Sequence, residues 1–64
     1  MSRPYRYMII TFMDGTIQRL GGNGDSLKGD GTVLTVYYDD GYGGLRDVHN
    51  FPVANIREYH WEAK

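Results

Sequence analysis

In this 64-residue sequence, the residues best suited to bind a partner molecule are aromatic side chains with arginines near them. Six tyrosines, two phenylalanines and one tryptophan are too many for so short a chain to bury completely. Phe12 and Phe51 are expected in the core. The aromatic side chains expected to keep at least one edge in water are Tyr5, Tyr7, Tyr37, Tyr42, Tyr59 and Trp61. Tyr and Trp are enriched where proteins bind proteins, because they are large, rigid and amphipathic.

Arginines lie near these aromatic residues in the sequence, and Arg46 and Arg57 join the predicted binding surface. Three interpretations of this surface stay open. It docks a protein, its tyrosines pair across strands and stiffen an exposed sheet, or it stacks single-stranded bases. Seven Lys and Arg against eight Asp and Glu give a net charge of −1, which counts against a nucleic-acid partner.

Residues suited to catalysis or metal binding are few. The chain has no cysteine, and its serines are Ser2, near the start, and Ser26, in a glycine-rich segment. His49 follows Asp47 at strand spacing, and His60 lies between two glutamates, so either imidazole could be oriented by a carboxylate or hold a metal weakly. Such neighbours are far more often solvated strand residues. We therefore expect no enzymatic activity, no metal and no cofactor.

The glycine-rich segment from Gly21 to Gly31 is the other candidate for ligand binding. It is similar to the calcium-binding nonapeptide, but Asp25 follows Gly24 without the spacer that this motif needs, and the motif works only in tandem copies. The Gly-x-Gly pairs lack the third glycine and the following helix of a phosphate cradle. We expect residues 21–31 to form a flexible loop.

Length and composition indicate a single domain over residues 1–64, with residues 1–4 and 62–64 frayed. Without cysteine there is no disulfide to supplement a small core. The longest uninterrupted apolar run is Met8-Ile9-Ile10, far short of the roughly 18 residues of a membrane span. With no signal peptide evident either, a cytoplasmic location is expected.

Apolar residues at period two predict five strands and no α-helix. The predicted strands are Arg6–Phe12, Thr16–Leu20, Thr32–Tyr38, Leu45–Phe51 and Arg57–Trp61. Asp14-Gly15 predicts a hairpin with a type I′ turn. Pro52 should end the fourth strand, and the spacing of Val53 and Ile56 predicts one 3-10 turn before the last.

The order hairpin, long loop, hairpin, 3-10 turn and final strand resembles the SH3-like small barrel. Pro52-Val53-Ala54-Asn55-Ile56 is similar to the segment before the last strand of SH3 domains, in its proline and its closing aliphatic residue. Asn55 stands where that family has a tyrosine lining the polyproline groove, and Trp61 lies in a different strand from the family's paired tryptophans. The resemblance implies an all-β, five-stranded SH3-like barrel, and it extends to the fold without extending to the polyproline groove.

The function expected from these residues is that of a non-enzymatic module that docks a partner protein, or a second copy of itself, through exposed Tyr and Trp. The alternative is a small barrel that binds single-stranded nucleic acid. The Asp-Gly hairpin and the ending Phe-Pro-Val-Ala-Asn-Ile-Arg-Glu are also similar in style to small accessory proteins of bacteria and their phages. That likeness implies a protein that modulates a host factor. No membrane partner is expected.

Overall fold

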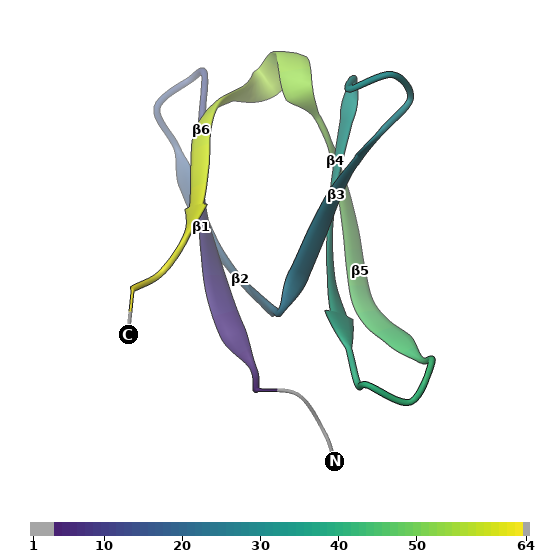
Figure 1. Ribbon diagram of the computed structural model, residues 1–64. Coiled ribbons are helices and arrows are strands. Elements are labelled where there is room, and N and C mark those ends of the chain that lie inside the picture. Colours follow the sequence, from purple (N-terminus) through teal and green to yellow (C-terminus); the bar gives the residue numbers. More distant parts are fainter. Residues whose placement is uncertain (1–3, 64) are drawn as a thin grey trace.

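The computed structural model describes residues 4–63 and shows an all-β chain of two three-stranded antiparallel sheets (Figure 1). One sheet has the order β2-β1-β6 and the other β3-β4-β5. The elements are β1 (Arg6–Phe12), β2 (Ile17–Gly22), β3 (Gly24–Lys28), β4 (Val33–Asp39), β5 (Leu45–Pro52), the 3-10 helix η1 (Val53–Asn55) and β6 (Ile56–Trp61). Since η1 is the only helical segment among residues 4–63, no helix there has the length or apolar character to span a membrane.

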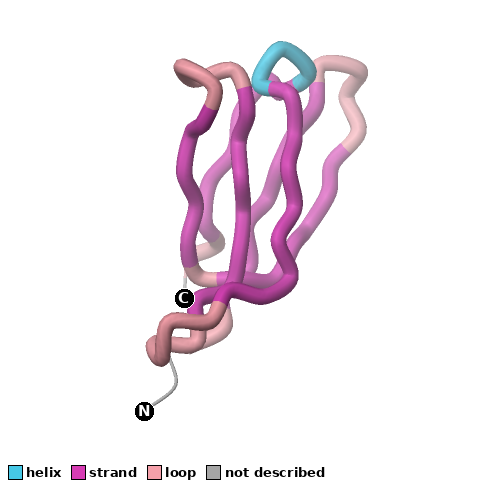
Figure 2. Tube along the Cα trace, turned by 90° about the vertical axis from the view of Figure 1, so that its right-hand side faces the viewer, coloured by secondary structure: helices cyan, strands magenta, loops and turns pink. Residues whose placement is uncertain are grey.

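The two sheets lie face to face and enclose a small core (Figure 2). Met8 and Ile10 of β1 and Leu34 and Val36 of β4 are completely buried. In each strand these two residues are two positions apart, as in the period-two pattern from which both strands were predicted. Leu20 completes the buried cluster. The residues packed around its margin are Phe12, Phe51, Val53, Ile56 and Trp61.

Residues 4–63 form six strands and no closed barrel, so the prediction of a five-stranded barrel was wrong. The difference arises in residues 21–31, which were expected to be a flexible loop. Gly21 and Gly22 end β2, Gly24–Lys28 is β3, and Asn23 between them bends the chain from one sheet into the other. The Asn23 amide group is held by Asp39, donating to its carbonyl and accepting from its N–H, both at 2.8 Å. The glycines here allow close packing, and they do not leave the segment loose.

The β1–β2 turn is a hairpin turn, but of another type than predicted. Gly15 has φ of +91°, whereas Asp14 is not among the residues with positive φ, which a type I′ turn would require. Gly15 donates to the Phe12 carbonyl at 3.0 Å and Phe12 to that of Thr16 at 2.8 Å, which defines a three-residue loop. The Asp14 carboxylate accepts from the N–H and the hydroxyl of Thr16, and these bonds lower the pKa of Asp14.

The predicted 3-10 turn is confirmed, and it connects the two sheets at the top of Figure 1. Val53 donates to the Thr32 carbonyl beside β4 at 2.9 Å, and Met13 beside β1 donates to the Asn55 carbonyl at 2.8 Å. One short turn is therefore hydrogen-bonded to both halves of the molecule. β5, the fourth of the predicted strands, ends at Pro52, one residue beyond its predicted end. Pro52 has no N–H to continue the pairing, so the strand stops there.

The C-terminal segment is more ordered than expected. Glu62 was predicted to be frayed, but its N–H donates to the Tyr7 carbonyl at 2.8 Å and its carboxylate binds Arg19. Residues 1–3 and 64, also predicted to be frayed, lie outside the described residues.

Candidate functional site

A continuous row of stacked side chains crosses both sheets at the end where β2 bends into β3. We call this row the aromatic ladder, and its members are Arg46, Tyr38, Tyr5, Tyr7 and Arg19. Arg46 lies over the Tyr38 ring at 5.1 Å, and Tyr38 meets Tyr5 at 5.2 Å between ring centroids. Tyr5 meets Tyr7 edge to face at 5.6 Å, and Arg19 lies over the Tyr7 ring at 3.7 Å. Such contacts favour aromatic pairs and cation–π pairs beyond their buried area.

Glycine positions the middle of the ladder. Gly21 of β2 is paired with Tyr7 of β1, and a Cβ atom on Gly21 would overlap the Tyr5 ring. Tyr5 thus packs over the backbone of Gly21, in space that the Cβ atom of any other residue type would fill. Gly24 likewise leaves room for the Tyr37 ring, and a Cβ on Gly22 would meet the Tyr37 carbonyl. The glycines are evident in the sequence, but the aromatic rings that approach them could not be predicted from it.

Carboxylates lie beside the ladder. The Glu62 carboxylate accepts from Arg19 Nε at 2.6 Å and from its Nη2 at 3.1 Å. These bonds lower the pKa of Glu62 and raise that of Arg19. The Tyr5 hydroxyl donates to Asp47 Oδ2 at 3.4 Å. Partial desolvation of the ring, and then the charge of Asp47, raise the pKa of Tyr5.

Asp47 reaches Tyr5 because of an irregularity in β5. Val36 is paired with His49 and Tyr38 with Arg46, so Tyr37 of β4 faces two residues of β5. Asp47, one of the two, has φ of +52°. This bulge turns the strand locally and brings Asp47 to Tyr5, while Arg46 stays opposite Tyr38.

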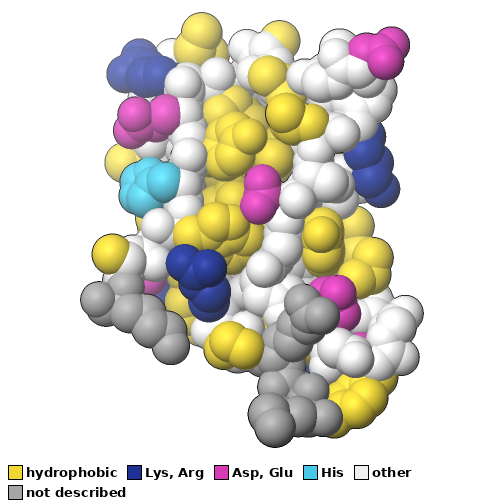
Figure 3. Space-filling view, viewed as in Figure 1, with side chains coloured by type: hydrophobic (Ala, Val, Ile, Leu, Met, Phe, Trp, Pro, Cys, Tyr) yellow, Lys and Arg dark blue, Asp and Glu magenta, His cyan; other side chains and the backbone are white. Residues whose placement is uncertain are grey.

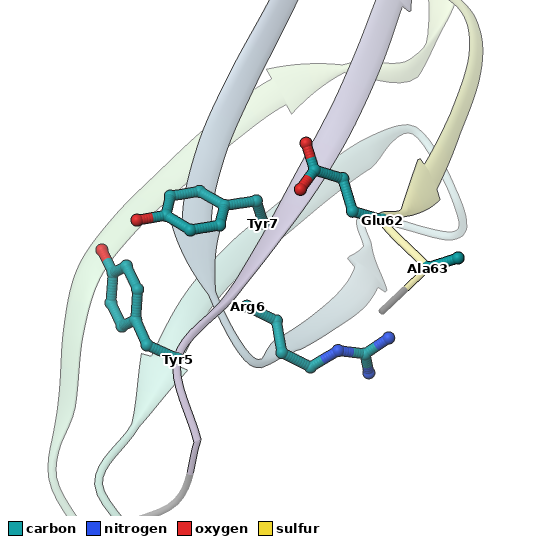
Figure 4. Close-up of a pocket in the computed structure, with 5 residues that line it drawn as sticks. All are labelled: Tyr5, Arg6, Tyr7, Glu62 and Ala63. Carbon is teal, nitrogen blue, oxygen red and sulfur yellow. The ribbon is translucent and has the colours of Figure 1, made fainter.

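Figure 4 shows the shallow pocket that borders the ladder, with a volume of about 190 Å³. Tyr5 and Tyr7 line one side with their hydroxyls close together, and Arg6 extends toward Ala63 on the other. A larger open pocket, of about 340 Å³, lies at the opposite end, between the β1–β2 turn and η1. The carboxylate that lines it, Asp14, already accepts two hydrogen bonds from Thr16.

Trp61 of β6 lies against the core and reaches across to the other sheet. Its indole N–H donates to Asp25 Oδ1 of β3 at 3.0 Å, and Arg6 lies 5.4 Å from the ring centroid. Trp61 therefore spans the opening between β6 and β3. Figure 3 shows hydrophobic side chains gathered in a stripe along this side of the molecule, between the two sheets.

The predicted site residues fall in several places. Tyr5, Tyr7 and Arg46 belong to the ladder, and Tyr5 is 48% exposed. Trp61 and Tyr59 lie on β6, opposite the buried Met8 and Ile10. The remaining three are Tyr37 over Gly24, Tyr42 in the β4–β5 turn and the exposed Arg57 of β6.

Sequence reasoning missed Tyr38, Arg19 and Glu62 as members or neighbours of the site. Tyr38 was not among the aromatic side chains expected to stay exposed, and it is 6% exposed. Its contact with Tyr5 depends on how the two sheets pack. Arg19 and Glu62 are 43 residues apart in the sequence. Only the register of β1 with both of its neighbours brings them over Tyr7.

Metal-binding clusters are not found in residues 4–63, where no three His, Asp or Glu side chains lie close enough to hold an ion. His49 stacks on Phe51 at 6.3 Å between centroids, and His60 is paired with Ile9.

Fold and site together define a small all-β protein with a tyrosine and arginine surface. The comparisons with known proteins add no relative, because no family model, no curated protein and no solved structure matches this chain.

Proposed function

We propose that this chain is a non-enzymatic module that docks a partner protein through the aromatic ladder. The observation that carries the proposal is the ladder itself, in which Tyr5 and Tyr7 are exposed and yet held by stacking between two arginines. Rigid, partly exposed Tyr and Arg side chains are the types that dominate binding energy at protein interfaces. Because their neighbours hold them in place, they lose little conformational entropy on binding.

The strand order supports a comparison with SH3-like binding modules. Counted as one bent strand, β2 and β3 give five strands in the order β6, β1, β2/β3, β4, β5, with η1 before the last strand in the sequence. We propose that the fold is an SH3-like variant on this basis. Asn55, in place of the groove tyrosine of SH3 domains, lines a pocket at the end away from the ladder. The proposed docking surface is therefore not a polyproline groove.

Single-stranded nucleic acid is the competing ligand, since tyrosines with arginines also stack bases. The charges around the ladder count against it. Glu62 neutralises Arg19, and Asp47 lies beside Tyr5 where a phosphate would have to approach. With a net charge of −1 over the whole chain, phosphate contacts would supply little affinity.

A capture experiment tests the proposal. The immobilised chain is exposed to cell lysate with and without nuclease, beside a Tyr5→Ala/Tyr7→Ala variant and a Tyr42→Ala control. Tyr42 is 69% exposed and lies in the β4–β5 turn, outside the ladder. We expect one protein to be retained by the wild type and the control, with or without nuclease, and lost by the double variant. Retention that needs intact nucleic acid, or equal retention by all three chains, would overturn the proposal.

A further inference from the structure

β6 forms one border of its sheet, and its outer edge is open. Within the part of the chain that the structure describes, β6 pairs only with β1. Glu62 donates its N–H to Tyr7 of β1, and in an antiparallel ladder the residues that face a given neighbour alternate. Tyr59 and Trp61 therefore turn their N–H and C=O groups away from β1, toward the open edge. An unpaired edge of this kind is a template for a further strand.

We propose that β6 pairs antiparallel with β6 of a second copy of this chain, about a two-fold axis at Tyr59. The inference goes beyond the aromatic ladder and does not depend on it. The two sheets of the pair would join into one continuous sheet in the order β2-β1-β6-β6-β1-β2. A two-fold interface of this type uses the same residues on both sides, so the sequence of β6 must be complementary to itself.

The charges of β6 agree with an axis at Tyr59. With the axis at Tyr59, Glu58 of each copy lies opposite His60 of the other, so each carboxylate faces an imidazole. An axis at Trp61 would also place His60 opposite Glu62, but it would lie at the end of the strand. Moving the axis to Glu58 would place that residue opposite itself, and moving it to His60 would place Glu58 opposite Glu62. Like charges directly opposite one another destabilise a strand pair, and complementary ones stabilise it.

The aromatic residues of β6 agree with the same axis. Tyr59 is paired with the buried Ile10 and Trp61 with the buried Met8, so both project toward the opening between the sheets. The axis places the two Tyr59 side chains opposite each other, and aromatic pairs stabilise facing strands. Figure 3 shows the stripe of hydrophobic side chains beside β6. Leu27 of β3 is exposed and is paired with the buried Leu34, so it adds apolar surface on the inner side of the other sheet.

β5 at the border of the other sheet is a poorer candidate for pairing. Its bulge at Asp47 twists the strand in the middle, and Pro52 at its end has no N–H to donate. Bulges and edge prolines are two devices that keep strands from pairing with other chains. In β6 the irregularity falls at Arg57, between the pairs Phe12–Ile56 and Thr11–Glu58, and leaves Glu58–Trp61 regular.

A single cysteine tests the register, because the chain has none of its own. Residues opposite each other in an antiparallel pair have Cα atoms roughly 4.5–5.5 Å apart, within the range that a disulfide spans. We expect Tyr59→Cys to oxidise to a disulfide-linked dimer, and Tyr42→Cys, at a more exposed position, to remain largely monomeric. Equal crosslinking of the two variants would indicate random collision and would overturn the proposal.

Sedimentation equilibrium of the wild type and of oppositely charged Tyr59 variants provides a second test. The wild type should change from 7.3 kDa toward twice that mass as its concentration rises. Tyr59→Lys and Tyr59→Glu should each be monomeric alone, because like charges meet at the axis, and should dimerise when mixed. A 7.3 kDa species at every concentration of wild type, or unchanged dimers of both folded variants, would refute pairing at Tyr59. If a charged variant does not fold, the comparison of Tyr59→Cys with Tyr42→Cys decides whether β6 pairs at Tyr59.

Discussion

At the scale of single residues, the glycines of the β2–β3 bend determine where the aromatic side chains lie. Tyr5 packs over Gly21 and Tyr37 over Gly24, and in each case a Cβ atom would overlap the ring. A residue type usually associated with flexibility here permits a fixed contact. The aromatic ladder depends on this contact, because Tyr5 is the link between Tyr38 of one sheet and Tyr7 of the other.

A double-mutant cycle measures that contact. Gly21→Ala should destabilise the wild type by about 1–3 kcal/mol, because the added methyl group displaces the Tyr5 ring. In a Tyr5→Ala background the same substitution should cost nearly nothing, since the space is then empty and alanine suits a strand better than glycine. Urea unfolding of the four chains supplies the free energies. An equal cost of Gly21→Ala in both backgrounds would show that Tyr5 does not pack on Gly21.

At the scale of elements, local pattern predicted most strands, and the contacts between elements could not be predicted. Apolar residues at every second position, Met8 and Ile10 in one strand and Leu34 and Val36 in the other, are enough to define β1 and β4 and their buried faces. β3 was missed because the glycine-rich segment around it resembles a loop in composition. Gly21 and Gly24 of this segment are instead required by the rings of Tyr5 and Tyr37 that pack over them. The ladder was found only in part for the same reason. Tyr5, Tyr7 and Arg46 were chosen as exposed residues, whereas Tyr38 and Arg19 join them only through sheet packing and register.

The pair Arg19–Glu62 ties β2 to the segment after β6 and predicts a dependence of stability on pH. The pKa of Glu62 in the folded chain lies below its ordinary value of 4.5, so its ionised form stabilises the folded state at neutral pH. That stabilisation is lost as the pH falls through the folded-state pKa. Glu62→Gln should therefore lower the thermal midpoint at neutral pH and have no effect in strong acid.

Scanning calorimetry of the wild type, Glu62→Gln and Arg19→Gln across this pH range measures the effect. Both variants should lose stability at neutral pH, and Arg19→Gln should lose more because it also loses its stacking on Tyr7. High salt should shrink the loss that comes from the ion pair, because both side chains are partly exposed. A difference between wild type and Glu62→Gln that persists unchanged in strong acid would show that the charge of Glu62 is not its cause.

At the scale of the whole molecule, two small sheets are connected at a few points around a core of five buried residues, Met8, Ile10, Leu20, Leu34 and Val36. Asn23 at the bend, η1 at the opposite end and the Trp61–Asp25 hydrogen bond between β6 and β3 supply the connections. A chain of this size buries a smaller fraction of its surface than larger domains do. Its aromatic side chains therefore stay partly exposed, and the contacts of the ladder keep them ordered.

Docking of a protein on the ladder is tested most directly by the affinity of the captured partner at low and at high salt. We predict a dissociation constant that changes little with salt and rises about 10-fold or more in Tyr5→Ala/Tyr7→Ala, as for the central aromatic residues of a protein interface. Tyr42→Ala should bind like the wild type. The opposite result is an affinity that falls about 10³-fold or more with added salt and is unaffected by the double substitution. That result is typical of phosphate binding and would contradict the docking of a protein on the ladder.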